Sequence, residues 1–196
     1  MSRSVRELER WGSSTGDGAF LAAMAAVALA LRVPRLAIAY WGDEAISVGI
    51  ASRPLHQIPT YLRFDGSPPL YYFILHYWIG LFGSSPVATH TLSLVVSLLA
   101  IPVAWWCGRA LFGPRAARSA ALLAAVCPYL AYYGTETRMY SIVALASMPA
   151  VTGLVMGLRA PPPPPGPTWG ARLRGDPANR WLALGAGATL VVLYTH

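Results

Sequence analysis

The sequence predicts an all-α integral membrane protein built as a multi-span helical bundle. Hydrophobic residues make up 55% of the 196-residue chain and charged residues only 12%, whereas soluble domains carry roughly twice that charged fraction. Several apolar runs are long enough for helices that cross a ~30 Å hydrocarbon core. All fifteen basic residues are arginines, and they lie between the apolar runs instead of on one polar face. This spacing is typical of membrane topology and argues against nucleic acid as a partner.

The first apolar run is the predicted first span, residues 19–39, which follows a polar N-terminal segment, residues 1–18, that we place in the cytoplasm. As a helix this run reaches about 30 Å at ~1.5 Å per residue. A cleavable signal is the alternative, but Glu7, Glu9 and Asp17 dilute the positive charge that such a segment needs. We expect Arg32, near the far end of the span, to snorkel to the interface.

Residues 40–86 are predicted to form the first external loop, with interfacial helices and no second span. Residues 44–52 resemble a short amphipathic helix, and residues 69–82 form an apolar segment rich in Tyr and Trp. Fourteen residues reach only about 21 Å as a helix. Tyr and Trp favour the membrane interface. We therefore expect residues 69–82 to lie on the bilayer surface.

Arginine placement supports this topology. If residues 69–82 do not cross, ten arginines fall on the side of the N-terminus and three on the other side; if they cross, the counts are four and nine. The positive-inside rule favours the first arrangement. It places the N-terminus and a proline-rich loop in the cytoplasm of a multi-pass plasma-membrane protein. The remaining predicted spans are 87–106, 119–133, 139–158 and 181–195, and the proline-rich loop is 159–180.

Four motifs then fall on the external side of the membrane. Carboxylates at a bilayer edge are costly to desolvate and often mark a site. Purely structural roles stay open for these residues: Asp43 could cap a helix, Asp65 could serve only in a turn, and Glu136 could only pair with Arg138. His56 and His76 are lone histidines, and no Cys/His spacing predicts a zinc site. The motifs are Asp43-Glu44, Asp65 with Tyr71 and Tyr72, Glu136-Thr137-Arg138-Met139-Tyr140, and Tyr194-Thr195-His196.

The ordered motifs resemble those of the GT-C membrane glycosyltransferases. The likeness is greatest to the family 39 branch, which includes protein O-mannosyltransferases and lipid A aminoarabinose transferases. It extends over about residues 19–196, although Ser67 stands where many members have His, and His90 where many have Arg. The matching series are Trp41-x-Asp43-Glu44-Ala45-x-Ser47, Ser67-Pro-Pro-Leu-Tyr-Tyr72 with Leu81-Phe82-Gly83, and Glu136-x-Arg138-Met-Tyr140.

The resemblance implies a GT-C fold and transfer of a hexose, such as mannose, from a polyprenyl-phosphate donor to an acceptor hydroxyl outside the cytoplasm. The acceptor is a lipid, glycan or protein, and membrane lipid is a further partner. No cofactor is predicted firmly, and a divalent metal is left open. Asp43 is the expected base, Glu44 the residue that orients the acceptor, and Glu136 a second acid. The expected substrate-binding residues are Arg138, Asp65, Tyr71, Tyr72 and Tyr140.

Two other functional classes stay open, a non-catalytic membrane subunit and a transporter-like protein. A transporter predicts acids inside the spans, whereas these acids lie at span ends. Family members have more spans than the five predicted here, and the chain ends at His196 directly after a span. We therefore expect the natural protein to continue, and residues 1–196 alone to be inactive.

Overall fold

Every regular element in the computed structural model, which describes residues 15–162 and 176–196, is a helix. Three of these helices are long and apolar enough to cross a membrane, over Gly16–Arg35, Pro86–Phe112 and Tyr140–Arg159. The predicted all-α membrane bundle is therefore confirmed. The elements are α2 (Thr15–Arg32), the 3-10 turn η1 (Val33–Arg35), α3 (Gly42–Ala51), α4 (Ile58–Asp65), α5 (Leu70–Phe82), α6 (Pro86–Phe112), α7 (Pro114–Val126), α8 (Pro128–Tyr133), α9 (Tyr140–Arg159) and α11 (Pro177–Thr195).

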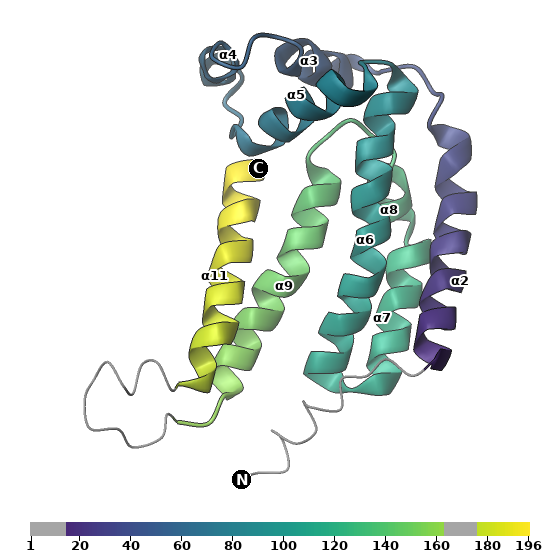
Figure 1. Cartoon of the computed structure of the whole chain (residues 1–196), viewed down its shortest axis with the longest axis vertical. Helices are drawn as coiled ribbons and strands as arrows, with labels where there is room; N and C mark the ends of the chain where they lie inside the picture. Colours follow the sequence, from purple (N-terminus) through teal and green to yellow (C-terminus); the bar gives the residue numbers. More distant parts are fainter. Residues whose placement is uncertain (1–14, 163–175) are drawn as a thin grey trace.

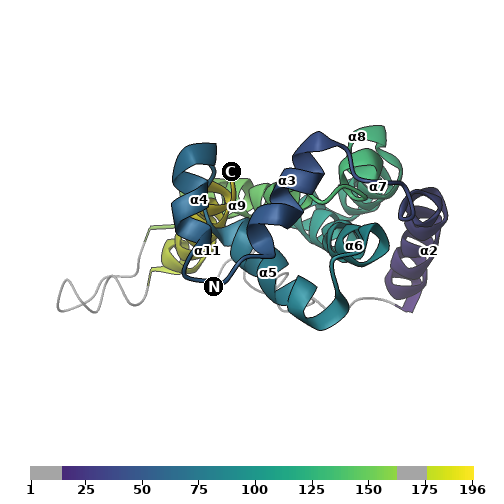
Figure 2. The ribbon, with the colours of Figure 1, turned by 90° about the horizontal axis from the view of Figure 1, so that it is seen from above.

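Helices α2, α6, α7, α9 and α11 run side by side, and α3, α4 and α5 lie across one end of them (Figure 1). Seen from above, these three helices lie over one part of that end and leave α2, α7 and α8 uncovered (Figure 2). We call α3, α4 and α5 the platform. The orientation of the thirteen-residue helix α5, across the bundle instead of along it, supports the interpretation that it does not cross the membrane.

The platform end of the bundle holds the candidate motifs. The C-terminal ends of α2, α8 and α11 meet the N-terminal ends of α6 and α9 beside the platform (Figure 1). Residues 1–14 of the predicted N-terminal segment 1–18, and residues 163–175 of the proline-rich loop, lie outside the described residues. Of the ten arginines in the described ranges, five lie at the far end, at positions 109, 115, 118, 159 and 180, and five lie at the platform end, at positions 32, 35, 53, 63 and 138.

The predicted span 119–133 differs from the structure, which divides it into two helices. Helix α7 ends at Val126 and α8 begins at Pro128. Cys127, between them, is extended with a ψ of 123°, because a proline disfavours the helical conformation in the residue before it. The thirteen-residue helix α7 is consequently shorter than a membrane span.

Apolar packing fixes the platform to the bundle. Tyr71, Tyr72 and Leu75 of α5 are buried against Leu92 of α6 and Met139, which precedes α9. Burial of each large apolar side chain contributes about 1.5–3 kcal/mol. The platform is therefore a packed layer of the fold, and it holds the loops beside it in place. The same cluster includes Ile50, Ala51, Ile58, Leu62 and Ile142.

The prediction that the Arg32 side chain snorkels to the interface is wrong. The side chain is fully buried and donates hydrogen bonds to the carbonyls of Ala125 at 2.8 Å, Ala124 at 3.2 Å and Ala28 at 3.3 Å. The carbonyls of Ala124 and Ala125 belong to the last turn of α7. There the helix leaves hydrogen-bond acceptors unpaired and carries partial negative charge. Arg32 thus joins α2 to α7.

Glycine permits the close approach of α9 and α11. A Cβ atom placed on Gly153 would lie 2.5 Å from both the Gly185 nitrogen and the Trp181 oxygen. Small residues of this kind let the backbones of membrane helices touch. Because α11 packs along α9, the C-terminal end of α11 lies near the platform (Figure 1).

Candidate active site

Glu44 is the most enclosed acid of the site and lies in the first turn of α3. It is only 3% exposed. Its Oε1 accepts hydrogen bonds from the Thr137 backbone N–H at 2.7 Å and from His90 Nε2 at 2.9 Å. Its Oε2 accepts one from the Trp41 backbone N–H at 3.2 Å, so the side chain reaches back over the start of its own helix. Both oxygens therefore act as acceptors, which is the pattern of an ionised carboxylate.

The electrostatics of Glu44 agree with that state. Burial by itself would raise the pKa of the carboxyl. The hydrogen bonds from His90, Thr137 and Trp41 outweigh burial, and the pKa of Glu44 lies below its usual value. Glu44 thus joins α3, α6 and the loop before α9 through one charged group.

A chain of hydroxyl groups holds the same three segments. Tyr40 donates to the Ser84 carbonyl at 2.7 Å, and its oxygen lies 2.7 Å from the Thr89 hydroxyl. The Thr89 hydroxyl in turn lies 2.8 Å from that of Thr137. Thr89 and Thr137 are fully buried. The loops around the site are therefore fixed by polar contacts as well as by packing.

Asp43 has a different environment from its neighbour Glu44. Its side chain is 48% exposed and pairs with Arg138, with 3.6 Å between Oδ2 and Nη2. Arg138 Nη1 also lies 3.4 Å from the Asp43 carbonyl oxygen and 3.5 Å from the Ser47 hydroxyl. Helix α3 begins at Gly42 with Trp41 as its N-cap, so Asp43 does not cap it. The alternative interpretation of Asp43 as a helix cap does not apply.

Glu136 is buried but its carboxyl is incompletely paired. The residue is 6% exposed, and its Oε2 has no hydrogen-bond partner among the residues that the structure describes. Burial raises the pKa of Glu136, and the nearby charge of Glu44 adds to that effect. The Ser93 hydroxyl donates to the Glu136 carbonyl and fixes the backbone there. Glu136 is therefore a fixed acid with a carboxyl oxygen free to accept a hydrogen bond.

Arg138 and Tyr140 lie next to each other, with the guanidinium carbon 5.7 Å from the centre of the tyrosine ring. Arg138 keeps its Nε without a hydrogen-bond partner within residues 15–162 and 176–196. The guanidinium is thus only partly neutralised by Asp43. Such a group can bind an anionic oxygen, because its planar donors match carboxylate and phosphate geometry.

Asp65 belongs to a separate cluster at the turn between α4 and α5. Its Oδ2 accepts hydrogen bonds from Ser67 at 2.5 Å and Tyr72 at 3.2 Å. Gly66 ends α4 with a φ of 78°, a conformation that favours glycine. Tyr71 is buried beside Tyr72, and its hydroxyl has no partner in the described part of the chain. Asp65 therefore fixes a turn.

The predicted site residues are thus brought together in part. Asp43, Glu44, Glu136, Arg138 and Tyr140 share one region, where the first turn of α3 meets the loop before α9. Within residues 15–162 and 176–196, no group of three or more His, Cys, Asp or Glu side chains is arranged to hold a metal ion.

Sequence reasoning did not predict that His90 pairs with Glu44, or that Tyr40, Thr89 and Thr137 form a hydroxyl chain. One signal was available for His90, since an ionisable residue inside an apolar run is a functional candidate by default. The spacing of 46 residues between Glu44 and His90 indicates no pairing by itself.

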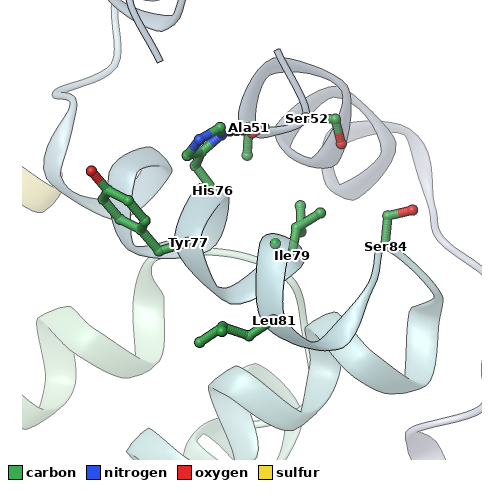
Figure 3. Close-up of a pocket in the computed structure, with 8 residues that line it drawn as sticks. Ala51, Ser52, His76, Tyr77, Ile79, Leu81 and Ser84 are labelled. Carbon is green, nitrogen blue, oxygen red and sulfur yellow. Dashed lines mark hydrogen bonds between the residues drawn. The ribbon is translucent and has the colours of Figure 1, made fainter. Parts of the chain in front are cut away.

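A pocket of about 540 Å³ opens at the platform, between the end of α3 and helix α5, and is separate from this site. Figure 3 shows His76 turned toward Ala51, and its Nδ1 donates to the Ala51 carbonyl at 2.7 Å. None of the predicted site residues lines this pocket. Its lining is Ala51, Ser52, His76, Tyr77, Ile79, Gly80, Leu81 and Ser84.

Fold and site together define a helical membrane protein with a cluster of acids and an arginine at one end of its bundle. Residues 66–159 match the family model described as dolichyl-phosphate-mannose-protein mannosyltransferase. This match supports a GT-C glycosyltransferase-like region, as the motifs predicted. The match includes Glu136 and Arg138 but begins after Asp43 and Glu44. Comparisons with curated proteins and with solved structures found no significant match.

Proposed function

We propose that this protein is a membrane glycosyltransferase that moves a hexose from a polyprenyl-phosphate donor to an acceptor hydroxyl on the extracytoplasmic side. The family match supports a glycosyltransferase of the mannosyltransferase type, which makes mannose the first sugar to test. The observation that carries the proposal is the pairing of the half-exposed Asp43 carboxylate with Arg138 next to Glu136. This arrangement offers a base and a cation side by side.

In the proposed reaction, Asp43 takes the proton of the acceptor hydroxyl. The acceptor oxygen forms a bond to C1 of the sugar, the bond from C1 to the phosphate oxygen breaks, and the polyprenyl phosphate leaves with the electron pair. A well-placed general base contributes about 10²–10⁴-fold to such a step. Asp43 suits this role because its side chain is accessible and makes no capping hydrogen bond to its helix.

Arg138 is the proposed partner of the donor phosphate. Its guanidinium carries donors that Asp43 leaves free, and charge-assisted hydrogen bonds to phosphate are about twice as strong as neutral ones. Tyr140 and Tyr72 border this cation. Positive charge beside the leaving phosphate stabilises the charge that develops as the C1–O bond breaks.

Glu136 is the proposed second acid. Its Oε2 has no partner in the described part of the chain and can accept a hydrogen bond from an acceptor hydroxyl. Glu44 is engaged on both oxygens and has no exposed edge, so we assign it the role of orienting the loops around Asp43. Asp65, Tyr71 and Tyr72 would support the donor from the side of α5, where a lipid approaches from the bilayer.

The proposed sidedness rests on charge. Among the described residues, five arginines lie at the bundle end opposite the platform and three lie in the segments beside the candidate site, leaving out Arg32 and Arg35 at the end of the first span. The positive-inside rule assigns the end with more arginines to the cytoplasm. Single cysteines test this in a background without Cys107 and Cys127. A cysteine at Ser67 should react with an impermeant reagent in intact cells. One at Thr168, which lies outside the described residues, should react only after the membrane is opened. Reaction of both from outside would overturn the topology.

The activity is tested in membranes from cells that express the natural protein. Supplied with polyprenyl-phosphate mannose labelled in the sugar, they should transfer label to an acceptor in an expression-dependent manner. Polyprenyl-phosphate glucose and galactose serve as the comparison donors. Absence of transfer from all three donors at normal protein levels would favour the alternative, a non-catalytic membrane subunit.

A further inference from the structure

His90 occupies an unusual position for a histidine, in the second turn of α6 and only 2% exposed. Its Nδ1 lies 2.9 Å from the Leu36 carbonyl oxygen, and its Nε2 lies 2.9 Å from Glu44 Oε1. A carbonyl oxygen only accepts hydrogen bonds, so Nδ1 carries a hydrogen. Glu44 is ionised, because its oxygens also accept from two backbone N–H groups. Nε2 therefore carries a hydrogen as well, and the ring is an imidazolium.

The groups that face His90 favour this charge. Glu44 approaches it from α3, and Glu136 acts on it from the loop before α9. Tyr40 packs edge-on against the ring, with 5.7 Å between ring centres. Burial raises the pKa of Tyr40, so its phenol stays neutral.

We propose that His90 is a positioning residue whose bound proton holds the candidate active site together. The imidazolium fixes the Glu44 carboxylate, and Glu44 in turn fixes the backbone N–H groups of Trp41 and Thr137. Asp43 directly precedes Glu44 in the chain, and Arg138 directly follows Thr137. The relative position of the proposed base and the proposed phosphate-binding cation therefore depends on one buried proton.

Loss of this proton has a defined structural consequence. Nδ1 keeps its hydrogen for the Leu36 carbonyl, so the lone pair of Nε2 would face Glu44 Oε1 at 2.9 Å. Two acceptors at that distance repel each other. Glu44 must then move away from Nε2, and its hold on Thr137 weakens. A misplacement of about 1 Å can cost roughly 10²-fold in rate.

The protonation state is measured directly by ¹⁵N NMR of the purified protein labelled at histidine. The described part of the chain includes His56, His76, His90 and His196, and the variant His90→Gln identifies the signal of His90. Both ring nitrogens of His90 should be protonated at pH 7.5. His76 is the matched comparison, because its Nδ1 also donates to a carbonyl but no carboxylate is bonded to its other nitrogen in the described structure. A neutral His90 at this pH would overturn the proposal.

The functional consequence rests on the proposed transferase activity. In the natural protein, kcat/KM should fall as pH rises through the titration of His90 seen by NMR, and His90→Arg, which keeps a permanent charge, should remove that fall. His90→Gln should lower kcat/KM by roughly 10–100-fold at pH 7.5, while His76→Gln should keep the wild-type pH profile. An unchanged profile in His90→Arg, or full activity in His90→Gln, refutes the positioning role. If no donor is turned over, the proposed function fails, and the NMR result still decides the state of His90.

Discussion

Replacing Asp43 with asparagine separates a catalytic carboxylate from a structural one. The substitution keeps the size of the side chain and removes its charge and basicity. In the structure Asp43 makes no capping hydrogen bond, and its ion pair with Arg138 spans 3.6 Å at a half-exposed side chain. Exposed ion pairs are worth about 0–1 kcal/mol, and an acid in a first helical turn gains about 0.3–1 kcal/mol. We therefore expect the free energy of unfolding to fall by no more than about 1–2 kcal/mol.

The expected effect on catalysis is larger. Loss of a general base costs about 10²–10⁴-fold, and 10²-fold corresponds to about 2.7 kcal/mol of transition-state stabilisation. The assay is transfer of labelled hexose in membranes matched for protein level, with melting followed on the purified variant. Asp43→Asn should lower kcat by 10²-fold or more with near-normal melting, because the charge acts in the reaction and contributes little to the fold.

Glu136→Gln is the matched variant for the second acid, and it decides between the two carboxylates. If Asp43 is the base, Glu136→Gln should affect the KM for the acceptor more than kcat, since Gln still accepts a hydrogen bond. A near-normal kcat in Asp43→Asn together with a 10²-fold loss in Glu136→Gln would refute our assignment and make Glu136 the base.

Three further predictions concern stability in detergent. Arg32→Leu should destabilise the protein by at least about 2 kcal/mol, seen as a lower melting temperature, because it leaves buried α7 carbonyls without their donor. Gly153→Ala should cost about 1–3 kcal/mol by forcing α9 from α11, whereas Gly187→Ala, with nothing within 4 Å of the added Cβ, should melt like wild type or slightly higher. The pKa of Glu136 is raised in the folded state, so its charge lowers stability as pH rises from about 4 through that pKa. Glu136→Gln should therefore be at least as stable as wild type at pH 7, with the difference vanishing near pH 4; a strong loss at pH 7 would contradict this.

The sequence predicted the helical bundle and the gathering of Asp43, Glu136 and Arg138 because both follow from simple rules. Apolar runs of span length must be helices in a bilayer, and motifs at consecutive external ends of helices meet at one face. Arginine asymmetry then decided that residues 69–82 do not cross. That α5 does not cross the membrane stays a prediction; in the structure α5 lies across the end of the bundle (Figure 1).

Other features depend on contacts between distant segments, which a single sequence does not encode in any period. Arg32 pairs with carbonyls 92 and 93 residues further along the chain, and His90 pairs with an acid 46 residues earlier. The difference in environment between Asp43 and Glu44 is another feature that the sequence does not predict. Adjacent residues in a helix point about 100° apart, so one faces the outside of the site and the other its interior, but the sequence does not say which.

The buried position of Arg32 bears on how the protein enters the membrane. Arg32 is synthesised 92 residues before Ala124. At a synthesis rate of about 5–20 residues per second, roughly 5–20 s pass before the carbonyls that accept its hydrogen bonds are made. A charge without partners is costly at membrane depth, and the first helix should stay near the interface until α7 arrives. Nascent chains arrested before residue 124 should therefore anchor poorly in microsomes, and Arg32→Leu should restore their anchoring. Equal anchoring of both chains would show that the arginine finds another partner during synthesis.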